Sequence, residues 1–301
     1  MPQTIVVKDL LKTYGEKKAV DRFSFAVEKG EVFGLLGPNG AGKTTTLECI
    51  EGIRKFDAGS IAVAGVDVSK KENKIRKLLG VQLQSSSLQE DIRTGEVMSL
   101  ICGWHQIPAR LDLLKRFGLE KEIGKQYGKL STGQKRRLHL ALALAPNPEV
   151  VVLDEPTAGL DVEGRTQLHQ IIRELKTEGI TFLMATHDMA EAEMLCDRIA
   201  IIINGRLATT GTPAQVTAAG NTDTKITIQT ARGSLLPGMD TTFARFTGSS
   251  DGYGIWMAQN VSKAVMELLS QVDAQGDEVR DLRVERPSLE ERFMEIVGQE
   301  G

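Results

Sequence analysis

Cysteine and long apolar runs are scarce in this sequence of 301 residues, and each scarcity argues against a class of protein. The three cysteines, Cys49, Cys102 and Cys196, are widely spaced and odd in number, so they suggest neither a disulfide framework nor a zinc site. No apolar run approaches the ~20 residues that span a bilayer, and the longest, LHLALALA and RIAIII, suit a buried helix and a buried strand. We therefore expect reduced, mostly buried thiols in a protein of the cytoplasm or of the cytosolic face of a membrane.

An excess of positive charge is lacking as well. The chain has 37 Lys and Arg against 40 Asp and Glu, a formal net charge of −3. Proteins that bind nucleic acid usually present a basic face to the phosphate backbone, so we expect no nucleic acid among the partners. The beginning of the chain, MPQTIVVKDLLK, lacks the charged-then-apolar pattern of a secretory signal.

The distribution of apolar runs predicts an α/β fold. TIVVKDL, FSFAVEKGEVFGLLG and GSIAVAGVDV predict antiparallel strands that flank a glycine-rich loop. VVVLD, ITFLMATH and IAIII are continuously apolar, as are strands of a parallel sheet covered on both faces. Asn204 and Gly205 follow the last of these runs and are typical of a type I′ hairpin turn.

Residues 88–145 have the apolar spacing of helices. Val97, Leu100, Ile101 and Trp104 recur at the positions of one helix face. RRLHLALALAPNP predicts a second helix, which its prolines end. We expect a helical subdomain here.

A run of small and polar residues, AAGNTDT at 218–224, predicts a domain boundary. We therefore expect one domain over residues 1–218 and a small α/β domain over residues 219–301. KITIQT, YGIWMA and VRDLRVE predict the strands of the second domain, and SKAVMELLSQV predicts its helix. Tyr253 and Trp256, in an alternating strand, are expected in its core.

The stretch GLLGPNGAGKTTT has the pattern of a phosphate-binding loop: Gly37, four residues, then Gly42, Lys43 and Thr44. It follows an apolar strand and precedes a helix, as this loop requires. The glycines let backbone N–H groups point at the phosphates of a nucleotide, Lys43 adds positive charge, and the Thr44 hydroxyl is a ligand for Mg²⁺. The residues expected to contact the nucleotide are Gly37, Pro38, Asn39, Gly40, Ala41, Gly42, Lys43, Thr44 and Thr45.

Two adjacent carboxylates end the strand VVVLD. Asp154 is expected to hold Mg²⁺, directly or through water. Glu155 points in a different direction from its neighbour and is expected to be the base that polarises the attacking water. His187 follows the strand ITFLMAT, at the sheet edge where ligands bind, and is expected at the γ-phosphate or the catalytic water.

The stretch KLSTGQKRRLHLALAL, just upstream of these carboxylates, resembles the signature motif of ATP-binding cassette (ABC) ATPases, usually LSGGQ. Ser131 can cap a helix that begins at Gly133, and the helix N-terminus then forms a second phosphate site. In the family this site completes the pocket of another subunit, so the resemblance implies ATP contacts from Ser131, Gly133 and Gln134 across a dimer. Thr132 replaces the first glycine, and a β-branched residue tolerates positive φ poorly; either the backbone is ordinary here or the motif is weakened.

Further positions resemble ABC motifs in their family order. Tyr14 is similar to the aromatic residue that stacks on adenine, with Val20 nearby. Gln84 resembles the glutamine that reaches Mg²⁺ and the attacking water, with Gln82 as the alternative. Asp161 ends a GLD sequence similar to the loop that crosses the dimer interface.

The end of the chain carries a finer resemblance. VERPSLEERFMEIVG is similar to the tail of type-2 ABC exporter ATPases, including those of drug-resistance pumps. Its residues alone predict an amphipathic helix with Leu289 and Phe293 on one side, capped by Ser288 with Glu291 three residues on.

The resemblance implies a P-loop ABC ATPase domain with a RecA-like parallel-sheet core, an antiparallel β subdomain and a helical subdomain. It implies ATP hydrolysis that powers export through a separate membrane permease, which the segment near residues 88–103 would contact. A second copy or a related ATPase subunit would complete the ATP sites, and the protein would lie on the cytosolic face of the membrane. The alternatives are a soluble ABC ATPase that acts on a macromolecular complex and the ATPase subunit of an importer.

Overall fold

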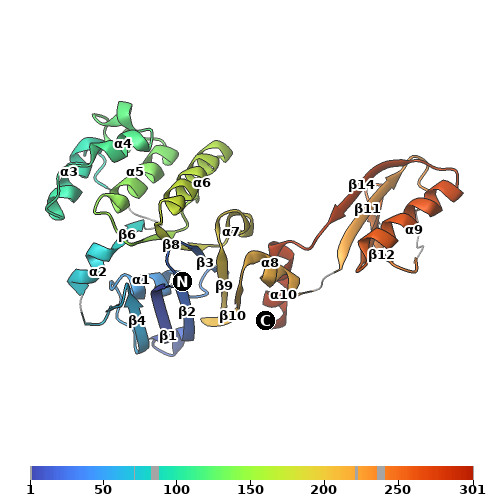
Figure 1. Cartoon of the computed structure of the whole chain (residues 1–301), viewed down its shortest axis with the longest axis horizontal. Coiled ribbons are helices and arrows are strands. Elements are labelled where there is room, and N and C mark those ends of the chain that lie inside the picture. The colour runs from blue at the N-terminus through green and yellow to red at the C-terminus, as the bar shows by residue number, and fades with distance from the viewer. Residues whose placement is uncertain (1, 71, 83–87, 221–222, 236–240, 301) are drawn as a thin grey trace. The chain divides into compact units, whose positions relative to one another are not determined.

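The computed structural model describes the chain except residues 1, 71, 83–87, 221–222, 236–240 and 301 (Figure 1). It divides into two units, Met1–Pro213 and Ala214–Gly301. The sequence places its domain boundary at residue 218, and that division remains a prediction. No helix of the described residues is long and apolar enough to cross a membrane.

An antiparallel sheet begins the first unit. Its strands lie in the order β2-β1-β4-β5. Their alternating side chains bury one face of the sheet in a core that includes Ile5, Val7, Phe23 and Phe25. The strands are β1 (Gln3–Tyr14), β2 (Lys17–Glu28), β4 (Ala58–Val63) and β5 (Val66–Asp67).

The central sheet has the order β10-β9-β3-β8-β7-β6 and is parallel except for β10. Every residue of β3, β7 and β8 is buried, as their continuous apolar runs predict. Asn204 and Gly205 have positive φ angles of 50° and 78° and join β9 to β10, which confirms the predicted hairpin. The strands are β3 (Val32–Leu36), β6 (Leu79–Gln82), β7 (Val150–Asp154), β8 (Thr181–Thr186), β9 (Arg198–Ile203) and β10 (Arg206–Gly211).

Helices cover this sheet and form a separate group beyond its β6 edge (Figure 1). The predicted helix near residue 97 is present, but its apolar positions divide: Val97 is buried, whereas Leu100 and Trp104 are 60% and 77% exposed. The helices are α1 (Lys43–Ile50), α2 (Glu72–Leu78), α3 (Thr94–Trp104), α4 (Leu111–Arg116), α5 (Thr132–Leu144), α6 (Val162–Thr177) and α7 (Met189–Leu195), with 3₁₀ turns at Glu120–Glu122 and Tyr127–Lys129.

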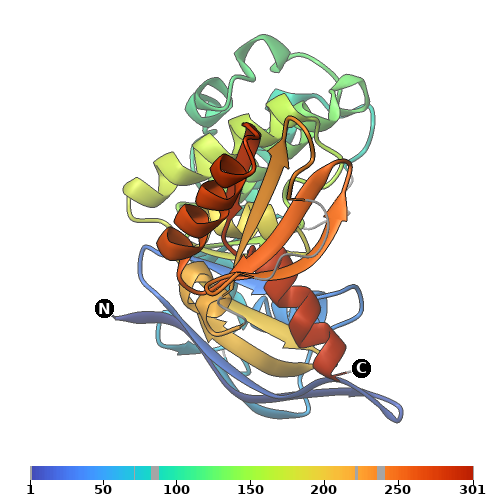
Figure 2. The ribbon, with the colours of Figure 1, turned by 90° about the vertical axis from the view of Figure 1, so that its right-hand side faces the viewer.

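The second unit has an antiparallel sheet in the order β12-β13-β11-β14, with α9 along one face (Figure 2). Trp256 is fully buried between sheet and helix, as predicted, with Ile226 and Leu268 in the same core. Tyr253, also expected in the core, is only half-buried, and its hydroxyl donates to Asp281. Ser288 caps α10 in the predicted capping box with Glu291. The elements are α8 (Pro213–Ala218), which begins at the division between the units, β11 (Thr224–Thr230), β12 (Arg245–Ser250), β13 (Tyr253–Ala258), α9 (Val261–Ala274), β14 (Val279–Glu285) and α10 (Leu289–Glu300).

The two tryptophans provide a matched test of this packing, because Trp256 is 0% exposed and Trp104 is 77% exposed. Trp256→Ala should destabilise the second unit by about 3–5 kcal/mol, since it leaves a cavity in a small core. Trp104→Ala should change stability by less than about 0.5 kcal/mol. Hydrogen exchange of the β11 and β13 amides measures the first effect, and thermal unfolding measures the second. Equal effects of the two substitutions would contradict the assigned core.

Candidate active site

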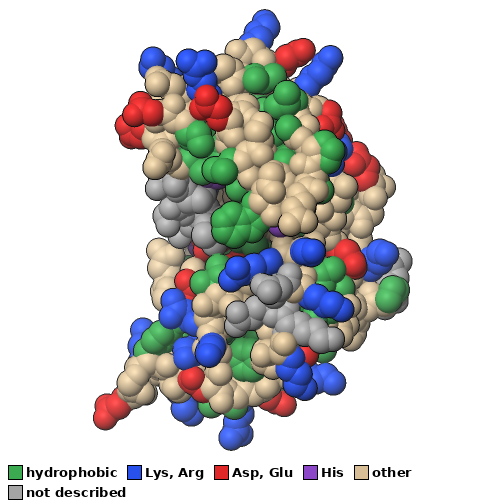
Figure 3. Space-filling view, turned by 90° about the vertical axis from the view of Figure 1, so that its left-hand side faces the viewer, with side chains coloured by type: hydrophobic (Ala, Val, Ile, Leu, Met, Phe, Trp, Pro, Cys, Tyr) green, Lys and Arg blue, Asp and Glu red, His purple; other side chains and the backbone are tan. Residues whose placement is uncertain are grey.

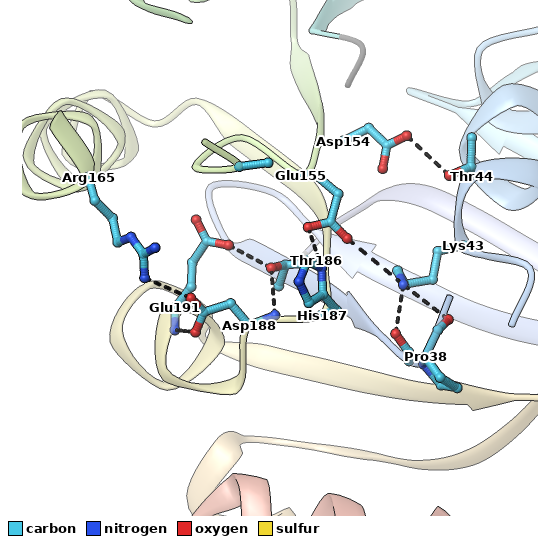
Figure 4. Close-up of polar contacts among 12 residues, drawn as sticks. Pro38, Lys43, Thr44, Asp154, Glu155, Arg165, Thr186, His187, Asp188 and Glu191 are labelled. Carbon is cyan, nitrogen blue, oxygen red and sulfur yellow. Dashed lines mark hydrogen bonds and ion pairs between the residues drawn. The ribbon is translucent and has the colours of Figure 1, made fainter. Parts of the chain in front are cut away.

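Neighbouring strands of the central sheet bring three functional segments together. β8 lies between β3 and β7, with Leu36 beside Thr186 and Asp154 beside Ala185. The phosphate loop follows β3, the two carboxylates end β7, and His187 follows β8. Since the carboxyl ends of parallel strands share one edge of the sheet, all three segments lie at that edge (Figure 4).

The loop between β3 and α1 needs glycine at specific positions. Gly42 has φ 108°, and a Cβ there would lie 2.3 Å from the Ala19 carbonyl oxygen. A Cβ on Gly37 would lie 2.3 Å from the Ile202 carbonyl oxygen. The loop backbone therefore lies so close to β2 and β9 that a side chain at either position would not fit. Its backbone N–H groups lead into the N-terminus of α1, which begins at Lys43 and favours an anion.

Lys43 is buried inside this loop. Its Nζ donates hydrogen bonds to the carbonyl oxygens of Gly37 at 2.6 Å and Pro38 at 3.3 Å, and it lies 3.9 Å from Glu155 Oε1. Burial lowers the pKa of Lys43, while the charges of Glu155 and Asp154 raise it. The amine is therefore held where phosphate oxygens would be stronger partners than the carbonyl groups.

Asp154 and Thr44 form the second polar group of the site. The Thr44 hydroxyl donates to Asp154 Oδ2 at 3.2 Å. Asp154 Oδ1 is buried with no hydrogen-bond partner among the described residues. Burial raises the pKa of Asp154, and the bond from Thr44 lowers it. A carboxylate oxygen without a partner beside a hydroxyl fits Mg²⁺, which takes oxygen ligands.

Glu155 has a backbone conformation that few residues with a side chain adopt. Its φ is 49°, and its N–H donates to the Ala185 carbonyl oxygen at 2.9 Å. The left-handed conformation costs roughly 1–2 kcal/mol and turns this side chain away from Asp154. Glu155 Oε2 lies 2.8 Å from Nδ1 of His187, and Oε1 faces Lys43 (Figure 4). The structure thus brings together Lys43, Thr44, Asp154, Glu155 and His187, all of which the sequence singled out.

A cavity of about 280 Å³ adjoins the loop, lined also by Tyr14, Lys17 and Ala19. Tyr14 is 42% exposed, and Arg54 and Lys12 lie 5.3 and 5.5 Å from its ring centroid. Val20, expected near the base, is fully buried in the core instead. Neighbours on a strand face opposite ways, so Ala19 faces the cavity and Val20 does not. Sequence reasoning missed Lys17, which the β1–β2 register places opposite Tyr14.

The signature stretch forms the start of α5. Ser131 is its N-cap and accepts a hydrogen bond from Gln134 N at 3.2 Å, and Gln134 Oε1 accepts one from Ser131 N at 3.0 Å. The helix begins at Thr132, one residue before the expected start at Gly133. Thr132 is the first helical residue, so the backbone here is ordinary. Gln134 also donates to Glu122 at 3.0 Å, which turns its side chain toward its own subunit.

A second cavity, of about 390 Å³, shares no lining residue with the first. Ser131, Thr132, Gly133 and Asp161 line it, but Gln134 does not. Asp161 caps α6 and accepts a hydrogen bond from Gly164 N at 2.8 Å. Within one chain, the signature residues and the phosphate loop therefore line different cavities.

The two glutamine candidates have different outcomes. Gln84 lies outside the described residues. Gln82 ends β6 and is buried, and neither side-chain amide atom has a hydrogen-bond partner among the described residues. The assignment of Gln84 remains a prediction.

A phosphate loop with two carboxylates and a histidine at the edge of a parallel sheet defines a P-loop nucleoside triphosphatase. Residues 20–158 match the family model described as ABC transporter. Daunorubicin resistance ATP-binding protein DrrA3 of Streptomyces coeruleorubidus is 34% identical over 98% of this chain and 96% of its own length. Nod factor export ATP-binding protein I of Burkholderia orbicola is 43% identical over 68% of this chain and 70% of its own length.

Solved structures give the same family. CbiO1 of Clostridium perfringens, part of the ABC transporter complex CbiONQ, is 31% identical with a TM-score of 0.66 over 72% of this chain and 92% of its own. The cassette MJ0796, in a dimeric post-hydrolysis state with ADP and Pi, is 25% identical with a TM-score of 0.63 over 69% of this chain and 98% of its own. The chain belongs to the ABC transporter family, and it is an ATPase. The fold, family and activity predicted from the sequence are confirmed.

Sequence reasoning also missed a buried acid at the end of α1, the helix that follows the phosphate loop. Glu51 directly follows α1 and is 6% exposed, and its two carboxylate oxygens have no hydrogen-bond partner among the described residues. Burial, with smaller contributions from Asp154 and Glu48, raises the pKa of Glu51 from 4.5 to about 7. Between pH 4.5 and about 7, Glu51 is therefore mostly neutral in the folded chain and mostly ionised in the unfolded chain.

Glu51 should make stability depend on pH. Between pH 4.5 and about 7 the folded chain binds more protons at Glu51 than the unfolded chain, so the free energy of unfolding falls as pH rises. Glu51→Gln should therefore stabilise the Mg²⁺-free protein by about 3 kcal/mol at pH 8, and the gain should shrink toward pH 5. Denaturant unfolding at several pH values measures it, with the exposed Glu16→Gln as control. A gain that is constant with pH would exclude Glu51 as its source.

Proposed function

We propose that this ATPase powers export through a separate membrane permease. The observation that carries the proposal is the likeness over nearly the full length to exporter subunits. DrrA3 and a Nod factor export ATP-binding protein of Ralstonia nicotianae each match 98% of the chain, so the likeness includes the second unit as well as the ATPase unit. If the relatives matched only the ATPase unit, they would support membership of the family but would not indicate export rather than import.

The phosphate loop is proposed to bind ATP. Loop N–H groups and Lys43 hold the phosphates, and Tyr14 stacks on the base at the other part of the cavity. Thr44 and Asp154 would hold Mg²⁺, which when bound neutralises phosphate charge. The residues proposed for the nucleotide are Gly37, Pro38, Asn39, Gly40, Ala41, Gly42, Lys43, Thr44 and Thr45.

Glu155 is proposed as the general base. Its Oε1 is 3.9 Å from Lys43 Nζ, near the expected phosphates, and its Oε2 is 2.8 Å from Nδ1 of His187. A carboxylate in this place can accept a proton from the water that attacks the γ-phosphate. His187, with a side chain 60% exposed, can contact both that water and the phosphate. Gln84 is proposed to orient the same water.

A second ATPase subunit, identical or related, is proposed to complete each ATP site. The cavity lined by Ser131, Gly133 and Asp161 offers the capped N-terminus of α5 to a phosphate. Since this cavity is distinct from the loop cavity, each would serve the nucleotide of the other subunit. Gln134 would act mainly by holding the cap.

The membrane partner is proposed to dock on α3. Leu100 and Trp104 are apolar and more than half exposed on this helix. Figure 3 views the side of the molecule where α3 lies, and hydrophobic side chains there lie between charged ones. An exposed tryptophan beside other apolar groups is typical of an interface. The protein would then lie at the cytosolic face of a membrane.

The two alternatives predict other partners. A soluble ABC ATPase would bind a macromolecular complex, and an importer subunit would work with a binding protein. The likeness to exporter subunits over the full length favours export over both.

Glu155→Gln should keep ATP binding and lower turnover by ~10²–10⁴-fold, because the amide fits the site but cannot accept the proton. His187→Ala should lower turnover by ~10²-fold. Steady-state ATPase assays and equilibrium binding of labelled ATP measure both. Normal turnover of Glu155→Gln would exclude it as the base.

The permease proposal is tested by affinity purification from solubilised native membranes, with the Glu155→Gln chain and Mg-ATP. We expect a polytopic membrane protein to be recovered. Trp104→Ala combined with Leu100→Ala should reduce this recovery at least about tenfold, as interface hot spots do, and leave ATP binding intact. Met266→Ala, 61% exposed on the second unit, is the control. Recovery of ribosomes or soluble proteins alone would overturn the transport proposal.

A further inference from the structure

A buried polar cluster lies directly behind His187. It consists of Thr186 at the end of β8, Glu191 on α7 and His169 on α6, which are 0%, 1% and 4% exposed. The Thr186 hydroxyl donates to Glu191 Oε2 at 2.7 Å (Figure 4). The other carboxylate oxygen, Oε1, lies 3.5 Å from His169 Nε2.

The same residues close the turn that carries His187. The N–H of Asp188 donates to the Thr186 hydroxyl at 3.0 Å, so this one oxygen joins the residues before and after the histidine. Asp188 in turn caps α7 and accepts a hydrogen bond from Glu191 N at 3.0 Å. His187 thus lies in a turn whose flanking side chains are both fixed.

Helix α6 contacts this turn at two points. Arg165 Nη1 lies 2.9 Å from Asp188 Oδ2, and His169, four residues on, faces Glu191. Residues four apart lie on the same helix face, so one side of α6 contacts the N-cap of α7 and its third residue, both in the first turn of that helix. The turn that carries His187 is therefore held by contacts from α6 as well as by strand β8, which it follows.

A carboxylate as deeply buried as Glu191 is costly unless its partners satisfy it. Here the Thr186 hydroxyl satisfies Glu191 Oε2, whereas Oε1 has no hydrogen-bond partner among the described residues and lies 3.5 Å from His169 Nε2. The carboxylate would lose its one side-chain hydrogen bond if Thr186 moved, so the cluster favours one arrangement of the turn. That arrangement places Nδ1 of His187 2.8 Å from Glu155. An apolar residue in place of Glu191 would fill the space without fixing the hydroxyl.

We infer that Glu191 is a positioning residue for ATP hydrolysis: through Thr186, and supported by His169, it holds His187 against Glu155. The inference rests on the role proposed above for His187. It assigns a task to three buried polar side chains that do not touch the nucleotide cavity.

The test is a double-mutant cycle in the ATPase activity of the full-length chain. Glu191→Gln and Thr186→Val should each lower kcat about tenfold to a hundredfold, with the KM for ATP changed less than about twofold, because the phosphate loop is untouched. Thr186→Ser keeps the hydroxyl and should retain activity. Added to His187→Ala, neither Glu191→Gln nor Thr186→Val should cause further loss. Glu193→Gln, the same change on the exposed side of α7, is the control.

The outcomes separate the two proposals. If His187→Ala leaves kcat unchanged, the role of the histidine fails and the inference fails with it. If His187→Ala lowers kcat and Glu191→Gln multiplies that loss, the role of the histidine stands and the inference is overturned.

A second measurement is independent of turnover. The chain has four histidines, so the imidazole NMR signals of His187 can be assigned by comparison with His187→Ala. Glu191→Gln and Thr186→Val should shift the Nδ1 signal of His187 in the same direction as Glu155→Gln does. An unchanged signal in folded Glu191→Gln protein would also overturn the inference.

Discussion

The contact on which the site depends is the backbone hydrogen bond from Glu155 N to the Ala185 carbonyl oxygen. It extends the pairing of β7 with β8 one residue past Asp154, at the point where φ of Glu155 becomes positive. The strand pairing therefore holds Glu155 in a conformation that its own sterics disfavour. Because Asp154 still follows the strand geometry, one carboxylate faces Thr44 and the other faces Lys43 and His187. Two adjacent acids acquire two environments from a single change in the backbone.

Much of this site was predictable because its polar residues occur in short sequence motifs. The phosphate loop, Asp154, Glu155 and His187 each stand at the end of an apolar run, and parallel strands bring such ends together without further information. The errors arose where a one-residue shift or a choice of face decides the outcome. Val20 and Ala19 are neighbours on one strand, and only the register with β1 shows which of them faces the cavity. Apolar spacing predicted α3, but it does not show that Leu100 and Trp104 face away from the core.

Other residues were beyond sequence reasoning because their properties come from tertiary packing. Glu51 is one of two acids in ECIEG, and its pKa is raised by its burial at the end of α1, with smaller contributions from Asp154 and Glu48. Glu191 looks like one of several surface acids in MAEAEML until Thr186 and His169 are found on either side of it. For the second unit the strands and the helix α9 were predictable, but β12, with its glycine and serines, lacks the apolar alternation that would indicate a strand.

Helix caps connect these observations. The side chains that cap α5, α6 and α7 are those of Ser131, Asp161 and Asp188. Each accepts a hydrogen bond from the backbone N–H of the residue three positions later. Each cap stabilises a helix start by only about 1 kcal/mol, far less than the burial of the strands behind it. Yet each one stands in a loop to which the proposed function assigns a role, and a cap fixes the backbone of the loop at that residue. The apolar runs therefore determine which loops meet, and the capping residues determine how those loops are shaped when they do.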